Sequence, residues 1–198
     1  MRRNIEGLDR PISESEVSFR RVDPRRDASL LLVLGGMVRT IRNPFVNRPG
    51  YGCFGCSPTN DQGLRMSFAE EGKDVVCSWM PELRFAGYGG ILHGGIQATL
   101  HDEIASWVVF VKLSTAGFTE RLEIDYRSPV RVEASPLALR SCLERMEGNR
   151  AFIRTKLFDS KGKLGSESLA VYFTLPQNIA RKKMAFPEDE SVFFSPDS

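Results

Sequence analysis

The sequence predicts an α+β domain in which an antiparallel sheet wraps around one long central helix. Two strand-like segments precede a mostly apolar helix, and four strand-like segments with short connections follow it. Short connections join antiparallel neighbours, and a helix that is apolar on most sides needs a curved sheet to cover it. The chain has 198 residues, of which 41% are hydrophobic, so it contains enough apolar side chains for one such core.

The strands are predicted from alternating apolar residues and from the turns between them. The first two run over Leu64–Ala69 and Asp74–Met80, with a turn at Glu71-Gly72-Lys73. The helix is predicted from about Gly94 to Leu113, where apolar residues cover most of its circumference after residue 103. The last four strands are predicted over Phe118–Arg127, Leu137–Met146, Ala151–Phe158 and Leu164–Leu175.

Outside this domain, which spans residues 51–175, the chain is expected to carry two flanking segments. Residues 1–50 form an N-terminal extension with a short helix near residues 28–42, which Asn43-Pro44 ends. Residues 176–198 show no sustained hydrophobic period and are predicted to form a C-terminal tail. The apolar run in the extension is shorter than the ~20 residues that a membrane span needs. With no signal peptide pattern after Met1, a cytoplasmic protein is expected.

The charges and the cysteines bear on partners and cofactors. The formal net charge is +2 and no long run of lysine and arginine is present, so a nucleic-acid partner is not expected. The segment Cys53-Phe54-Gly55-Cys56 is a CxxC pair, but zinc binding needs two further ligands with close spacing. The pair is therefore interpreted as structural thiols in a reducing compartment, and no metal or other cofactor is expected.

The segment most informative about function is Ile91–Glu103, ILHGGIQATLHDE. It sets a His-Gly-Gly turn at the start of the apolar helix and two acids, Asp102 and Glu103, within it. A helix N-terminus without bulky side chains can stabilise a developing negative charge. A carboxylate carried into apolar surroundings is costly unless it is paired, hydrogen-bonded or reacting. The two features together point to an acyl-transfer site.

The order of motifs resembles that of the hotdog-fold acyl-CoA thioesterases of the PaaI-like type, over roughly residues 53–175. The matching pieces are Cys53-Phe54-Gly55-Cys56, Asn60-Asp61-Gln62-Gly63-Leu64, Phe85-Ala86-Gly87-Tyr88-Gly89-Gly90, His93-Gly94-Gly95, Ala98-Thr99-Leu100, Asp102-Glu103 and Asp125-Tyr126-Arg127-Ser128-Pro129. The resemblance implies a hotdog fold, an acyl-CoA substrate and thioester hydrolysis. It is fairly specific for the superfamily and does not name the acyl group.

The resemblance also implies roles for the residues of the motif. A backbone N–H of Gly94 or Gly95 polarises the thioester carbonyl, and His93 holds the turn. Asp102, nine positions after the histidine, serves as nucleophile or as general base. Thr119, at the start of the next strand, positions the attacking water or the acid.

Three further residues are candidates for substrate binding. Gly87 stands where several members of the family carry Asn or Gln, which helps to hold the substrate carbonyl or the nucleophile. Glu103 is a second acid next to the catalytic candidate. Arg127, at a strand end, is a candidate for binding the CoA phosphates.

Helix geometry adds an independent expectation about oligomeric state. Gly94 and Asp102 are eight residues apart, or ~12 Å along one helix, and they lie on different sides of it. They cannot easily meet at one carbonyl carbon. If both are catalytic, they come from different protomers, so a homodimer or a dimer of dimers is expected.

Three other interpretations compete with hydrolysis, and one of them is a protein of this fold with an unknown role, whose extension Met1–Gly50 recruits a partner. A hotdog dehydratase or hydratase carries a catalytic His and Asp within a short motif at the helix start, and this helix lacks that spacing. A non-catalytic hotdog protein that binds acyl-CoA or a small molecule is the alternative that the Gly87 departure favours. The apolar segment Leu30–Ile41 is also a candidate cap for the acyl tunnel.

Overall fold

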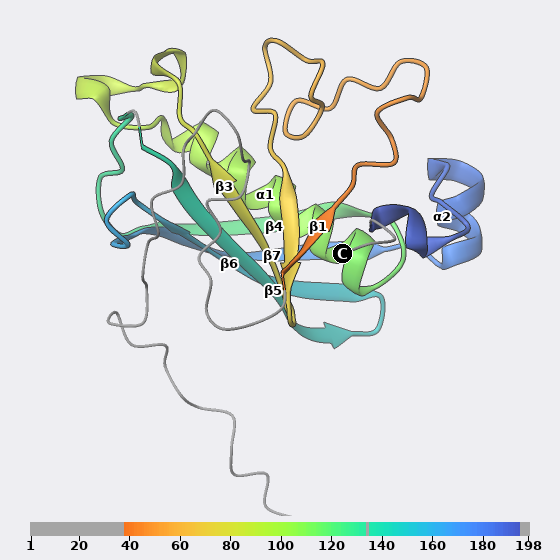
Figure 1. The fold of residues 1–198 in the computed structure, drawn as a ribbon. Helices are drawn as coiled ribbons and strands as arrows, with labels where there is room; N and C mark the ends of the chain where they lie inside the picture. Colours follow the sequence, from red (N-terminus) through yellow and green to blue (C-terminus); the bar gives the residue numbers. More distant parts are fainter. Residues whose placement is uncertain (1–37, 134, 195–198) are drawn as a thin grey trace, which may run out of the picture.

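The computed structural model describes residues 38–133 and 135–194. Over these residues, seven strands form one antiparallel sheet, and the long helix α1 packs across it (Figure 1). The predicted α+β fold, with an antiparallel sheet around one central helix, is confirmed.

The strands of the sheet follow the order β1-β2-β3-β5-β6-β7-β4. Strand β4 therefore forms one edge, although it directly follows α1 in the chain. The strands are β1 (Val38–Ile41), β2 (Phe68–Glu71), β3 (Asp74–Trp79), β4 (Gly117–Tyr126), β5 (Leu137–Glu147), β6 (Arg150–Phe158) and β7 (Leu164–Thr174). The last four agree with the predicted strands to within one residue at each end.

Helix α1 spans Gly94–Lys112, as the sequence predicts to within one residue. One face packs against strands β3 to β7. The other face is covered by the loop between β1 and β2 and by the C-terminal segment, so Leu100, Ile104 and Trp107 are almost fully buried. Trp107 stacks on Phe68 and meets Phe45 edge-on. This cover on both faces explains why the helix is apolar nearly all round.

The N-terminal extension departs from the prediction where it is described. Residues 38–41, the end of the expected helix near residues 28–42, form strand β1, which pairs antiparallel with β2. The rest of that expected helix, and most of Leu30–Ile41 as a tunnel cap, lies outside the described residues. Val38, Thr40 and Ile41 are β-branched residues, which favour a strand when a neighbouring backbone offers hydrogen bonds.

The C-terminal segment also departs from the prediction, because it is built into the core. Helix α2 (Gln177–Met184) and the 3₁₀ helix η4 (Glu190–Phe193) lie within the expected tail. Phe186 and Phe193 are buried against each other, and Phe193 contacts Trp107 edge-on. Two aromatic residues seven positions apart do not form a hydrophobic period that predicts a helix or a strand. Their side chains nevertheless bury enough apolar area to pack the segment against the core.

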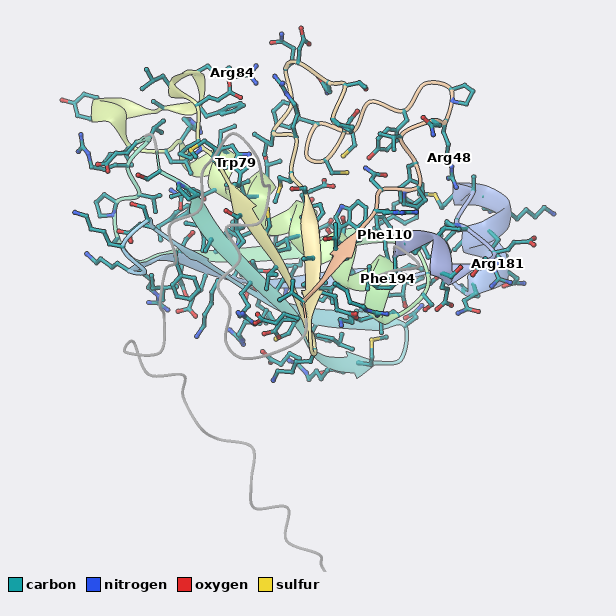
Figure 2. All side chains as sticks on the ribbon, viewed as in Figure 1. Arg48, Trp79, Arg84, Phe110, Arg181 and Phe194 are labelled. Carbon is teal, nitrogen blue, oxygen red and sulfur yellow. The ribbon has the colours of Figure 1, made fainter. Side chains whose placement is uncertain are left out.

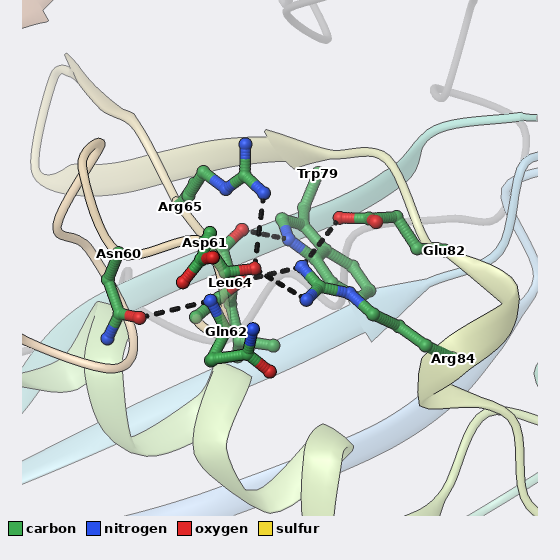
Figure 3. A network of polar contacts seen from close by, with 9 residues as sticks. Asn60, Asp61, Gln62, Leu64, Arg65, Trp79, Glu82 and Arg84 are labelled. Carbon is green, nitrogen blue, oxygen red and sulfur yellow. Dashed lines mark hydrogen bonds and ion pairs between the residues drawn. The ribbon is translucent and has the colours of Figure 1, made fainter.

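A polar network attaches the loop that follows the CxxC turn to the sheet (Figure 3). The indole Nε1 of Trp79 donates to the carbonyl oxygen of Leu64 at 2.7 Å, and the Arg84 guanidinium donates to the carbonyl oxygen of Asp61 at 2.5 Å. The backbone N–H of Leu64 in turn donates to the carbonyl oxygen of Phe54. Residues 64–67 are thus held against the turn, so β2 begins at Phe68 and not at Leu64 as predicted.

None of the helices over the described residues has the length and the apolar run that a membrane crossing requires.

Candidate active site

The first half of the candidate site is the turn that opens α1. His93 is the N-cap of the helix, and its ring Nδ1 accepts a hydrogen bond from the Gly95 N–H at 3.0 Å. The N–H groups of Ile96 and Gln97 donate to the carbonyl oxygen of His93. The Gly94 N–H has no acceptor among the residues that the structure describes. Of the two glycines predicted to polarise a carbonyl, Gly94 therefore carries the available donor at the positive end of the helix dipole.

Two neighbours shape this turn. The hydroxyl of Tyr126, from the far end of β4, donates to the carbonyl oxygen of Gly94 at 2.8 Å. Gly87 lies on the other side, where its N–H donates to the carbonyl oxygen of Ile91. A Cβ on Gly87 would meet His93 at no less than 3.5 Å, which is ordinary contact, so the space beside the histidine is open to a side chain.

The second half of the candidate site is the carboxylate of Asp102, two turns further along α1. Its Oδ1 accepts a hydrogen bond from the Thr119 hydroxyl at 2.7 Å. The Tyr172 hydroxyl lies 2.7 Å from the same oxygen and 2.8 Å from the Asp102 carbonyl oxygen, so it shares one proton between them. No partner of Oδ2 occurs within the described part of the chain. One carboxylate oxygen is therefore held and the other is available for reaction.

Tyr172, on β7, is a site residue that the sequence analysis missed. Burial raises the pKa of the Tyr172 hydroxyl well above its usual value, and the negative charge of Asp102 raises it further. The hydroxyl therefore remains a proton donor at any physiological pH. It lies 70 residues after Asp102 in the chain, and tyrosine is common in strands. The only available signal is that a buried tyrosine needs a partner for its hydroxyl.

His101, the residue before Asp102, is not part of the reacting half-site. Its ring is fully buried between the hydroxyls of Ser166, at 2.9 Å, and Ser168, at 2.8 Å. Burial lowers the pKa of His101 to about 4, so the ring is neutral near pH 7. Both nitrogens are engaged with serines of β7, and the ring joins helix to sheet.

Glu103 points away from Asp102 and its partners. Its Oε1 accepts from the indole Nε1 of Trp107 at 3.2 Å, and its Oε2 lies 3.4 Å from the sulfur of Cys53. Burial, together with the neighbouring Cys53 sulfur, raises the pKa of Glu103 to about 7. The structure therefore separates the two adjacent acids, and Glu103 shares no hydrogen-bond partner with the Asp102 carboxylate.

Arg127 also lies apart from both halves of the site. Its exposed guanidinium pairs with Asp125 and Glu167, each at 2.9 Å, on the outer surface of β4 and β7. Its predicted contact with CoA phosphates stays a prediction. The structure thus brings together Asp102 and Thr119 on one side, and His93, Gly94, Gly95 and Gly87 on the other.

The two halves share one feature, the free edge strand β4. Thr119 near the start of β4 holds Asp102, and Tyr126 at its end holds the Gly94 turn. Over the described residues, β4 pairs with β7 on one side only. Phe118 and Tyr126 are each 53% exposed on this strand. A ten-residue edge strand that exposes aromatic side chains is a surface on which a second chain can pair.

Comparisons with known proteins show which families and folds the chain is similar to. Residues 89–166 match the family model of the thioesterase superfamily. The chain is 28% identical over 120 residues to acyl-coenzyme A thioesterase THEM4 of Rattus norvegicus. The matched region covers 58% of this chain and 51% of that protein. The chain thus spans about half the length of this curated relative.

Solved structures show the same fold. The crystal structure of thioesterase superfamily member 2 from Mus musculus matches with a TM-score of 0.51 at 22% identity, over 57% of this chain and 84% of that chain. The crystal structure of AziG from S. sahachiroi matches with a TM-score of 0.53 at 18% identity, over 57% of this chain and 92% of that chain. At these identities the likeness concerns the fold, and it confirms the hotdog architecture.

Proposed function

We propose that this chain, whose residues 89–166 match the family model of the thioesterase superfamily, hydrolyses an acyl-CoA thioester to a free acid and CoA. One observation carries the proposal. On the same helix, Gly94 offers a backbone N–H without an acceptor, and Asp102 offers a carboxylate with one oxygen held and one available. The first suits a developing oxyanion and the second suits an attacking group or a base.

In the proposed reaction, the thioester oxygen accepts a hydrogen bond from the Gly94 N–H at the start of α1. This bond and the helix dipole stabilise the negative charge that forms when the carbonyl carbon is attacked. His93 supports this step indirectly, because its ring holds the Gly95 N–H and so sets the first turn of the helix. His93 is exposed and its Nδ1 is occupied, so it acts as a positioning residue.

Asp102 then acts in one of two ways that both use its Oδ2. It attacks the carbonyl carbon to form an anhydride that water opens, or it removes a proton from a water that attacks directly. In both routes the carbon–sulfur bond breaks, the CoA sulfur leaves as a thiolate and takes up a proton, and water supplies the second oxygen of the acid. Thr119 and Tyr172 hold Oδ1 and orient the carboxylate.

We also infer that the active form is a dimer through β4, because the two halves of the site lie ~12 Å apart on one helix. Thr119 and Tyr126 lie equally far on either side of the point between Leu122 and Glu123. An antiparallel pairing of two β4 strands about a two-fold axis near the middle of the strand brings the Thr119 end of one strand beside the Tyr126 end of the other. Asp102 of one protomer then faces the Gly94 turn of the other.

Hydrolysis itself is tested with a panel of short, medium, long and aromatic acyl-CoA substrates. Release of free CoA is followed by chromatography, because the four cysteines would react with a thiol dye. We expect turnover of at least one class of substrate. Binding without turnover, measured by calorimetry on the folded protein, would instead favour a non-catalytic acyl-CoA binding protein and direct attention to Gly87.

The shared site is tested by complementation between two inactive variants. Asp102→Asn removes the carboxylate, and Gly94→Pro removes the N–H of the helix start. A heterodimer of the two, isolated by different affinity tags, has one site with both groups intact, so we expect about half of the wild-type activity. If each site used groups from one protomer, neither site of the heterodimer would be intact, and no activity would return.

A further inference from the structure

Three metal-ligating side chains converge on the side of α1 that faces away from Asp102. We call Cys53, Cys56 and Glu103 the thiol–carboxylate cluster. One ligand atom from each lies within 4.8 Å of the other two. The cysteines are on the turn that precedes β2, and Glu103 comes from the middle of α1, so two segments 47 or more residues apart supply the set. Neither the proposed hydrolysis nor the held carboxylate of Asp102 uses any of these groups.

The spacing of the cluster fits a tetrahedral metal. Zinc binds cysteine sulfur at about 2.3 Å and carboxylate oxygen at about 2.0–2.2 Å, so a tetrahedral edge between sulfur and oxygen is about 3.5 Å. The Cys53 sulfur lies 3.4 Å from one oxygen of Glu103 and 3.6 Å from the other. Gly55 makes this approach feasible, because a Cβ at that position would lie 2.3 Å from a Glu103 carboxylate oxygen.

The groups around the cluster are hydrogen-bond donors. The Trp107 indole donates to Glu103. The hydroxyl of Tyr51 lies 2.9 Å from the Cys56 sulfur and itself accepts from the Asn43 side-chain amide at 2.7 Å. Donors of this kind orient metal ligands and stabilise them in their anionic form.

Neither cysteine nor Glu103 forms an ion pair with a described residue. Without an ion, the Cys53 sulfur lies within hydrogen-bonding reach of the Glu103 carboxylate. A bound cation would replace this contact and let both thiols bind as thiolates. All three line a cavity of about 310 Å³, together with Phe45, Arg48, Tyr51 and Phe110. Figure 2 shows Arg48 and Phe110 on the side of the molecule that carries α2.

We propose that Cys53, Cys56 and Glu103 bind one Zn²⁺ ion per protomer, with the fourth coordination position facing this cavity. Thiolate ligands in a tetrahedral set favour zinc over magnesium or calcium, which prefer oxygen ligands. Both thiols release their protons when the ion binds. The ion joins the loop before β2 to the face of α1 that this loop covers. The CxxC pair lacks further ligands close to it in the chain, and the tertiary fold supplies the third from α1.

The proposal is tested by metal content, without reference to activity. The full-length protein is reduced with a phosphine, incubated with excess Zn²⁺, desalted and measured by plasma mass spectrometry and native mass spectrometry. We expect one zinc per protomer in the wild type and in Cys142→Ser, a matched control with a half-buried thiol on β5. We expect the zinc to be lost from Cys53→Ser, Cys56→Ser and Glu103→Gln.

Two further measurements keep the test independent of how well the variants fold. Co²⁺ in place of Zn²⁺ is expected to give the strong near-ultraviolet absorption of thiolate ligation in the wild type. Zn²⁺ is expected to protect Cys53 and Cys56 of the wild type from alkylation, but not Cys142. A folded, reduced wild type that holds no zinc after loading would overturn the proposal, as would zinc that persists in both cysteine variants.

Discussion

Replacing Asp102 by asparagine is expected to lower kcat for acyl-CoA hydrolysis by ~10²–10⁴-fold, the range typical of a lost general base. The amide has almost the same shape, and its oxygen still accepts from Thr119 and Tyr172. It is neither a nucleophile nor a base, so the reaction loses the group that acts through Oδ2. The effect is measured as kcat and KM on the best substrate of the acyl-CoA panel.

Tyr172→Phe is expected to lower kcat less than Asp102→Asn does. It removes a hydroxyl that orients the carboxylate but leaves the carboxylate in place. Because a hydrogen bond to a charged group contributes about 1.5–3 kcal/mol, we expect a loss in kcat of about tenfold or somewhat more. An Asp102→Asn variant that is folded and retains wild-type kcat would remove Asp102 from the mechanism, whatever Tyr172→Phe does.

Replacing Gly94 by proline is expected to lower kcat by ~10²–10³-fold, the usual cost of one oxyanion donor. Gly94 is the first residue of α1, where proline is well tolerated, because the N–H that it lacks forms no bond within the helix. The preceding residue must be extended, and His93 already is, with φ −56° and ψ 133°. The substitution therefore removes the proposed donor with little disturbance of the helix.

Gly94→Ala is the matched control for the proline variant. It adds a Cβ in the same place, 3.4 Å from the Tyr126 hydroxyl, but keeps the N–H. We expect it to retain most of the wild-type kcat. Equal losses in the alanine and proline variants would show that the added bulk, and not the missing N–H, lowers the rate, and Gly94 would then not be the oxyanion donor.

Local patterns in the sequence predict an antiparallel sheet around one helix, and the resemblance to a known family adds the hotdog fold. The same patterns predict the ends of most of the helices and strands. After residue 103 the helix is apolar nearly all round, as expected of a buried helix, and the alternation of buried residues in β5, β6 and β7 repeats about every two residues. The His-Gly-Gly turn and Asp102 were also visible, because a helix start and an acid within an apolar helix are local features of the sequence. Such patterns depend on neighbours in the chain, so the sequence displays them directly.

Which side chains come into contact depends on the tertiary structure. It divided Asp102 from Glu103, although they are adjacent in sequence, because successive helix residues point about 100° apart. It brought Tyr172 to Asp102 and the CxxC turn to Glu103 across 47 or more residues. It also placed β1 and the C-terminal aromatic residues in the core, against the expectation of a helix and a tail. These contacts depend on the order of strands in the sheet and on packing between distant segments, which no local pattern encodes.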